Sequence, residues 1–243
     1  IYVDGFAHGM RPVMLTSRKD GKKHLAKMMW GYLPDHVKNM ESAEKFWRGY
    51  VNEKGKFIKG YVTLNAVGEE LLDKPMYAEA ARTRRCIIFT DGFYEWMHVY
   101  PKNKRTGEPL KTAIKYPYLI HFKENKEPLM MAGIWNPWKH TEVDTDTGEL
   151  VNLVTPTFAI CTAPATDTMA QVHNSKLRMP TILTKELALE WLSEGLSEER
   201  IIQLASYQSK EALKAYSIAK DFQKVTSPKQ AFEYQEVPPI LCD

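Results

Sequence analysis

Short apolar runs rich in β-branched and aromatic residues recur along the chain, and they constrain its fold more than any other feature. Runs of this length and composition are typical of β-strands. They are Pro12–Thr16, Leu25–Trp30, Cys86–Thr90, Tyr116–Phe122, Pro128–Ile134 and Leu153–Ala163. The sequence Thr145-Asp146-Thr147-Gly148 offers turn residues between two extended stretches. We therefore expect a hairpin tip at this position.

Helix signals are fewer, and they lie between the strand candidates. The expected helix-start residues are Ser42, Pro75, Thr184 and Ser197. The helix that begins at Pro75 should run toward Arg84, and the one capped by Thr184 should cover Glu186–Glu194 and end at Gly195. Because helices interrupt the strands without regular βαβ alternation, the pattern predicts an α+β fold with a largely antiparallel sheet system.

Length and composition point to one soluble domain covering residues 1–243. The chain has no internal repeat, low-complexity tract or Gly/Ser linker, and no apolar run approaches the ~20 residues that span a bilayer. Its three cysteines are too few and too scattered for a disulfide framework, which favours a reducing, cytoplasmic compartment. The chain starts at Ile1 without an initiator methionine, so we expect a segment to precede it.

The net charge of +3 does not by itself indicate a nucleic-acid-binding protein, so the placement of charge matters more. Basic residues cluster at Arg82, Arg84 and Arg85 and again at Lys102, Lys104 and Arg105, whereas acidic residues gather at Glu142, Asp144, Asp146 and Glu149. A solvated surface explains any single cluster adequately. The clusters are also compatible with a phosphate-binding face.

Familiar catalytic motifs are absent from the sequence. It contains no GxSxG, HExxH, Walker or GxGxxG pattern, and its seven histidines and three cysteines lack metal-ligand spacing. Neither a metal nor a cofactor is therefore expected. Three segments instead mix polar and aromatic residues where a plain core would be apolar: Thr63–Glu70, Arg85–Trp96 and Val172–Pro180. Together they supply an amide, a carboxylate and an imidazole, which suit proton transfer.

These segments resemble the ordered motifs of the SRAP (SOS-response-associated peptidase) family. Asp91-Gly92-Phe93-Tyr94-Glu95-Trp96 resembles its specific DGFYEW hexapeptide, and the other two segments resemble its NAR-type and IH-x-RMP-type motifs. Three shorter elements agree in order: Trp30–Pro34, Gly133–Trp135 and Thr162–Ala165. The resemblance extends over nearly the whole chain, and it implies a single domain with barrel-like sheets flanked by helices.

The resemblance also implies a partner and a reaction. Proteins of this family recognise abasic sites in single-stranded DNA, and the cysteine after the initiator methionine becomes the mature N-terminus by autoproteolysis. Its amine and thiol react with the aldehyde of the lesion to form a thiazolidine cross-link. Cys86, Cys161 and Cys242 have no free α-amine beside the thiol and are better explained as small hydrophobic residues. The reactive cysteine should then precede Ile1, and the protein should associate with the nucleoid when it is bound to DNA.

The resemblance assigns catalytic roles to three residues. Asn65 should hold the N-terminal cysteine or the substrate, Glu95 should be the general acid/base, and His173 should assist opening of the deoxyribose. Each also has an ordinary structural explanation: Asn65 as an Asx-turn residue, Glu95 as a surface residue in a strand-end turn, and His173 as a structural histidine. If the catalytic assignment holds, the three side chains line one cleft.

DNA-binding roles are carried over in the same way. Arg178 should contact a phosphate, Trp30 and Trp96 should stack on bases unless they belong to the core, and Thr162 is a weaker candidate for a backbone contact. Lys38, Arg82, Arg84 and Arg85 are candidates to add positive potential to the cleft. Three departures from the family pattern affect binding: Val67 replaces the NAR arginine, Phe89 replaces a proline, and the His173–Arg178 spacing is two residues longer.

Two other functions remain open at this stage. The first is a non-covalent single-stranded DNA-binding module that has lost the chemistry, which the absent N-terminal cysteine and Val67 favour. The second is a general protease or other hydrolase that does not act on DNA, against which the absence of nucleophile motifs counts. Neither partner proteins nor a membrane association is indicated by the sequence.

Overall fold

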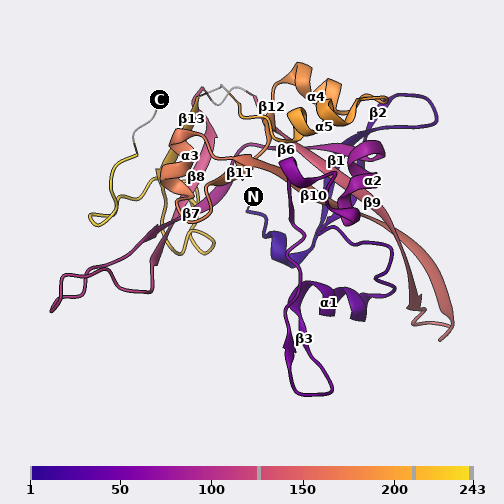
Figure 1. Ribbon diagram of the computed structural model, residues 1–243, viewed down its shortest axis with the longest axis horizontal. Helices are drawn as coiled ribbons and strands as arrows, with labels where there is room; N and C mark the ends of the chain where they lie inside the picture. Colours follow the sequence, from indigo (N-terminus) through magenta and orange to yellow (C-terminus); the bar gives the residue numbers. More distant parts are fainter. Residues whose placement is uncertain (1, 125–126, 210–211, 241–243) are drawn as a thin grey trace.

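Five strands close into a barrel in the computed structural model, which describes residues 2–124, 127–209 and 212–240 (Figure 1). The barrel strands are β1 (Met10–Thr16), β2 (Lys23–Trp30), β6 (Arg85–Thr90), β9 (Leu129–Val143) and β10 (Leu150–Pro164). Pairing runs from β1 to β2, β10, β9 and β6 and returns to β1, so the circuit has no free edge. Three short strands extend it: β5 (Asn65–Val67), β11 (Arg178–Pro180) and β12 (Ile182–Leu183).

Strands β9 and β10 form a long hairpin whose outer part projects from the body (Figure 1). Each has 15 residues, which is longer than the sequence indicated. The sequence did not predict the outer part of these strands because hydrophobic and polar residues do not alternate there between a buried and an exposed face. Val143, Leu150 and Val154 are all exposed. The predicted tip at Thr145–Gly148 is confirmed, since these residues connect the two strands and Gly148 has a φ of 74°.

Alternation along the barrel strands divides the core into two layers. In β10, Phe158 and Ile160 face the barrel interior, whereas Ala159 and Cys161 face outward. Three helices pack on the outward side: α2 (Pro75–Thr83), α4 (Lys185–Trp191) and α5 (Glu198–Ala205). The buried indole of Trp191 donates to the carbonyl oxygens of Cys86 and Gly133, both at 3.2 Å, and so fastens α4 to β6 and β9.

A second sheet packs against one end of the barrel interior. It consists of β7 (Phe93–Val99), β8 (Ile114–Phe122) and β13 (Leu213–Ser217), all antiparallel, with β8 in the middle. Met97, Tyr118 and Ile120 join the same buried cluster as the barrel interior. Helix α3 (Asp167–Val172) packs beside β7 and places Met169 and Val172 in that cluster. Glu95 in β7 and His173 at the end of α3 therefore lie where two sheets and a short helix meet.

A helix and a small hairpin form a separate lobe below the barrel in Figure 1. They are α1 (Met40–Arg48) and the pair β3 (Tyr50–Val51) and β4 (Phe57–Ile58), and two 3-10 helices lie at Gly5–Ala7 (η1) and Gly68–Glu70 (η2). The N-cap of α1 is Asn39 rather than Ser42, so that prediction was wrong by one turn. Ser42 occupies the third helical position and completes a capping box with Asn39.

The other helix boundaries follow their local signals closely. Thr184 and Ser197 cap α4 and α5 by accepting hydrogen bonds from Leu187 and Arg200, as predicted. Helix α4 ends at Trp191 rather than Glu194, because Leu192 already turns the chain toward Gly195. The α+β fold with largely antiparallel, barrel-like sheets is confirmed, although β10 pairs in parallel with β2 and β5. No helix within the described ranges is long and apolar enough to span a membrane.

Candidate active site and nucleic-acid interface

Glu95 and His173 come together from distant parts of the chain. Glu95 lies in β7, and His173 ends α3, with the imidazole Nδ1 3.6 Å from the Glu95 carboxylate oxygen Oε1. Both side chains are largely but not fully buried. A carboxylate and an imidazole held side by side in a partly enclosed position can pass protons to and from a bound substrate.

Local contacts fix the orientation of the histidine. Its Nδ1 donates to the carbonyl oxygen of Arg178 at 2.7 Å, so the neutral ring carries its proton on Nδ1 and leaves Nε2 as the base. Asn174 anchors the same segment to β7, accepting from the backbone N–H of His98 at 3.0 Å and donating to its carbonyl at 2.9 Å. Leu177 adopts a left-handed φ of 54°, which closes the loop between His173 and Arg178.

Burial sets the acidity of Glu95. Phe93, Glu95 and Met97 share one face of β7, and both hydrophobic members of this row pack into the barrel cluster. The pKa of Glu95 is raised above its ordinary value, chiefly because this burial disfavours the carboxylate, while His173 and the backbone of Trp96 act in the opposite direction. A raised pKa favours the protonated carboxyl, which is the form that a general acid needs.

Arg178 is already engaged by protein groups. Its guanidinium forms a two-pronged ion pair with Glu69, at 2.8 and 2.7 Å, and also donates to Thr162. This contact lowers the pKa of Glu69, with the Arg178 hydrogen bonds as the largest cause. The guanidinium Nε is buried and has no hydrogen-bond partner among the described residues. A phosphate would therefore have to displace or share Glu69 to reach Arg178.

Asn65 and Val67 lie on the exposed face of β5. This strand pairs with β10 opposite Ile160 and Thr162, and β11 pairs with the same part of β10. Asn65 and Arg178 thus belong to strands that pair with one segment of β10. Within the described ranges, the Asn65 side chain forms no hydrogen bond with Glu95 or His173. The expected gathering of three catalytic side chains is thus seen directly for two of them and stays a prediction for Asn65.

The two tryptophans predicted to stack on bases occupy different environments. Trp30 donates from Nε1 to the Leu64 carbonyl oxygen at 2.9 Å, and its ring lies nearly parallel to that of Phe158. This places Trp30 directly beside the strand that carries Asn65. Trp96 alternates with Glu95 along β7 and packs on the opposite face, against the cluster of Leu119, Ile218 and Phe222. Base stacking stays a prediction for both.

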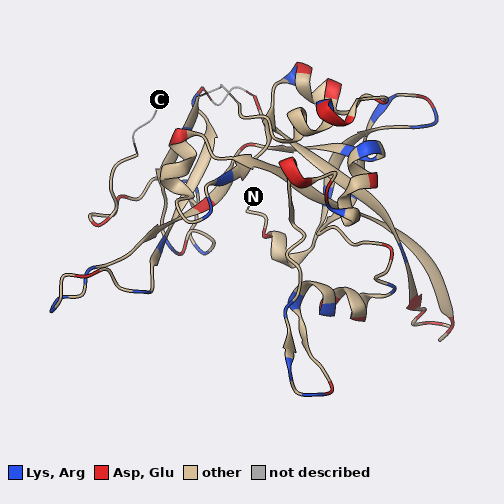
Figure 2. Ribbon diagram, viewed as in Figure 1, with Lys and Arg blue, Asp and Glu red and all other residues tan. Residues whose placement is uncertain are grey.

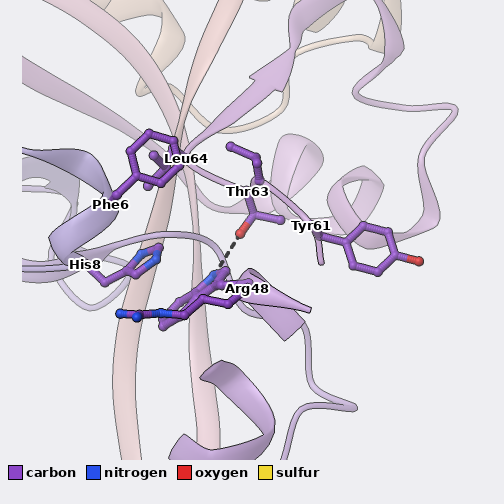
Figure 3. Close-up of a pocket in the computed structure, with 8 residues that line it drawn as sticks. Phe6, His8, Arg48, Tyr61, Thr63 and Leu64 are labelled. Atoms are coloured by element: carbon purple, nitrogen blue, oxygen red, sulfur yellow. Dashed lines mark hydrogen bonds between the residues drawn. The ribbon is translucent and has the colours of Figure 1, made fainter. Parts of the chain in front are cut away.

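An aromatic pocket of about 330 Å³ is lined in part by Thr63 and Leu64, the two residues that precede Asn65 in the sequence (Figure 3). His8 and Trp47 stack at 3.6 Å on its floor, and the Trp47 indole N–H donates to the Thr63 hydroxyl at 3.1 Å. Phe6 and Tyr61 remain 65% and 59% exposed at its walls. Sequence analysis missed this pocket, because its residues come from separate segments and only Thr63 and Leu64 fall within a motif.

The basic cluster at the end of α2, whose members are candidates to add positive potential to the cleft, is engaged by other groups of the protein. Arg82 is paired with Glu198 and Arg84 with Glu79, each at 2.6 Å. Arg85 is buried, and its guanidinium donates to backbone carbonyl oxygens of α2, α4 and Ser193. Lys38 donates to the carbonyl oxygen of Asp35 in the loop before α1. Of these candidates for positive potential, Arg85 is the one whose donors are all directed to carbonyl oxygens of the protein interior.

The cysteines within the described ranges are not nucleophiles. Cys86 and Cys161 are buried in β6 and β10, and burial raises the pKa of both thiols. Cys242 lies outside the described residues. Within those same ranges, no group of three or more His, Cys, Asp or Glu side chains could hold a metal ion.

Comparison with known proteins identifies the family. The family described as SOS response associated peptidase (SRAP) matches residues 6–225, so the chain belongs to the SRAP family. Abasic site processing protein YobE of Bacillus subtilis is 30% identical over 209 residues, covering 85% of this chain and 76% of the relative. Abasic site processing protein YoqW of the same species is 31% identical over 219 residues, covering 89% and 78%.

A solved structure shares the fold of this chain. A protein from Bacteroides thetaiotaomicron, known by its crystal structure, superposes with a TM-score of 0.65 at 28% identity, covering 94% of this chain and 81% of that protein. Abasic site processing protein YedK of Escherichia coli is 26% identical over 195 residues, covering 80% of this chain and 66% of that protein. The motif resemblance seen in the sequence is thereby confirmed at the level of the family.

Proposed function

We propose that this protein senses abasic sites in single-stranded DNA and cross-links to them through a cysteine at its mature N-terminus. The observation that carries the proposal is the Glu95–His173 pair, with Glu95 held by burial in a state that favours protonation. Relatives named for abasic site processing support DNA as the partner. The exposed aromatic pocket beside Asn65 supports an unpaired strand, because its rings offer stacking faces to bases outside a duplex.

The proposed chemistry needs a proton donor and acceptor at one carbon atom. The α-amine adds to the aldehyde of the opened sugar, and loss of water gives an imine. The thiol then adds across the C=N bond and closes a five-membered thiazolidine. Glu95 protonates the departing oxygen, and His173 removes or returns protons through Nε2 while Arg178 holds its Nδ1–H. The autoproteolytic step that exposes the cysteine would use the same two groups.

The first described residues lie close to the strand that carries Glu95. Tyr2 packs edge-on against Tyr94, with ring centroids 5.4 Å apart, and against Phe222 at 5.2 Å. Tyr94 lies next to Glu95 in β7, although its side chain points to the opposite face. The start of the described chain thus contacts the strand that carries Glu95, which supports a role for the N-terminal segment in the reaction.

Adduct formation tests this proposal. A form of the protein that carries an N-terminal cysteine, mixed with single-stranded DNA containing an abasic site, should give an adduct that survives denaturing electrophoresis. The chain beginning at Ile1 should give none, because none of Cys86, Cys161 and Cys242 has a free α-amine beside its thiol. DNA with a tetrahydrofuran analogue, which has no aldehyde, serves as the matched control. Binding without any adduct would replace the covalent function with a non-covalent one, and an absence of binding would overturn both.

The Glu69–Arg178 pair gives a separate test of phosphate binding. Replacing Glu69 with Gln removes the charge that neutralises Arg178 while keeping one hydrogen-bond acceptor. We expect the affinity for single-stranded DNA to rise by roughly two- to fivefold, as the loss of one partly exposed ion pair allows. Arg178→Gln should lower it. Fluorescence anisotropy measures both variants. Weaker binding by Glu69→Gln would show that Glu69 is needed to position Arg178.

A further inference from the structure

The connection between β7 and β8, together with the first two residues of β8, forms a strongly basic arm, here defined as residues 100–115. It contains five basic residues and one acidic residue, Glu108. The basic residues, all of them exposed, are Lys102, Lys104, Arg105, Lys111 and Lys115. Figure 2 shows this arm projecting from the small sheet with basic positions out to its tip. The charge therefore extends away from the body on the same hairpin that carries Glu95.

The charges of the basic arm are not neutralised by the protein. None of its five basic side chains takes part in an ion pair with any of the described residues. This distinguishes the arm from Arg82, Arg84 and Arg178, which are each paired with a glutamate. Unpaired exposed cations are the groups that release counterions when a phosphate chain binds.

The backbone of the arm is ordered by its own hydrogen bonds. Asn103 accepts from the backbone N–H groups of Arg105 and Thr106 through Oδ1, and its own N–H donates to the Glu108 carbonyl. Leu110 donates to Pro101 at 2.8 Å, which closes the two sides of the loop. These bonds order the loop that carries Lys102, Lys104 and Arg105, which lowers the entropic cost of binding a DNA strand there.

The long β9–β10 hairpin carries the opposite charge at its end. At the end of the β9–β10 hairpin, residues 142–149 include Glu142, Asp144, Asp146 and Glu149 and no Lys or Arg. Figure 2 shows the two arms on opposite sides of the molecule along its longest axis. This asymmetry of charge favours a polyanion that approaches along the basic arm and disfavours one that approaches along the β9–β10 hairpin.

We propose that the basic arm binds phosphates of the DNA strand that flanks the lesion and directs that strand along β7 and away from the acidic hairpin. This inference rests on the proposed function and adds the path of the strand to it. Lys102 lies seven residues beyond Glu95 in the sequence, which at ~3.3 Å per extended residue is about 23 Å. Strands that end within a few nucleotides of the lesion will therefore not reach the arm.

Salt dependence provides the test. The variant Lys102→Gln, Lys104→Gln, Arg105→Gln should bind a long strand, with about ten nucleotides on each side of a tetrahydrofuran site, less tightly than the unaltered protein. The slope of log affinity against log salt should become shallower by about 2, from ~0.7 per lost phosphate contact on single-stranded DNA. On a short strand with two nucleotides on each side, the two proteins should bind equally. The adduct rate at saturating abasic DNA should not change, because Glu95 and His173 are untouched.

The β1–β2 turn supplies a matched control. Lys19, Lys22 and Lys23 are exposed there, and Lys19→Gln, Lys22→Gln, Lys23→Gln removes the same charge at the far side of the molecule (Figure 1). This control should keep the slope of the unaltered protein. An arm variant that also keeps that slope on the long strand would overturn the inference while leaving the proposed function intact. Failure of the unaltered protein to bind either strand would overturn the proposed function itself.

Discussion

Replacing Glu95 with Gln should slow adduct formation by about 10²- to 10⁴-fold, the usual contribution of a positioned general acid/base. Gln has nearly the same shape and can still accept from the backbone N–H of Trp96, but it cannot deliver a proton. The affinity for abasic DNA should not fall, because no phosphate contact is removed. Single-turnover kinetics at saturating DNA measure the rate, and anisotropy with the tetrahydrofuran analogue measures the affinity.

A glutamate far from the site controls for the loss of charge. Glu53, exposed in the β3–β4 hairpin, should tolerate the change to Gln without any effect on the rate. The pH dependence adds a second criterion. Because the pKa of Glu95 is raised by burial, the rate should fall as the pH rises through that pKa, and the Gln variant should lose this limb of the profile. A variant with an unchanged rate would remove Glu95 from the mechanism.

The same burial predicts a cost to stability. A folded-state pKa above the unfolded value means that Glu95 favours folding fully only below the unfolded pKa of ~4.3 and loses that contribution as the pH rises through the folded pKa. Glu95→Gln should therefore be more stable than the unaltered protein at neutral pH and equally stable near pH 4. Thermal unfolding at both pH values would show this exchange of stability for acid/base function.

Local sequence signals predicted the helix starts well because the relevant contacts span only a few residues. Thr184 and Ser197 cap helices through N–H groups three residues ahead. Strand β13 and helix α3 were not predicted, since each is short and depends on distant partners. Strand β13 pairs with β8 across Leu213 to Ser217, and α3 packs on β7. The closure of the barrel through β2 and β10 was likewise invisible in the strand pattern alone.

The candidate site shows the same division. Motif order was enough to identify Glu95 and His173 as partners, and their 3.6 Å separation agrees with that expectation. The ion pairs of Arg178 and Arg82 could not be predicted, because their partners lie far away in the sequence. Arg178 meets Glu69 across 109 positions, and Arg82 meets Glu198 across 116. Counting charges in a run of sequence therefore does not show which arginines are neutralised by a distant carboxylate.

Arg85 provides the second large expected effect, and it concerns stability. This guanidinium, 8% exposed as a residue, donates to the carbonyl oxygens of Ala81 and Arg82 in the last turn of α2 and to that of Trp191 at the end of α4. One cation thus satisfies the free carbonyl groups of two helix C-termini and opposes their partial negative charge. Its Cζ also lies 5.6 Å from the centroid of the Trp191 ring.

Arg85→Met should therefore lower the free energy of unfolding by about 3–5 kcal/mol, since it leaves several buried carbonyl oxygens without donors. Urea denaturation measures the loss. Arg82→Met is the control: its ion pair with Glu198 is half-exposed, and breaking it should change stability by less than ~1 kcal/mol. The Arg85 variant that remains folded at low temperature should bind abasic DNA as tightly as the unaltered protein, because the guanidinium faces the helices. Weaker DNA binding at unchanged stability would instead indicate that Arg85 contributes to phosphate binding.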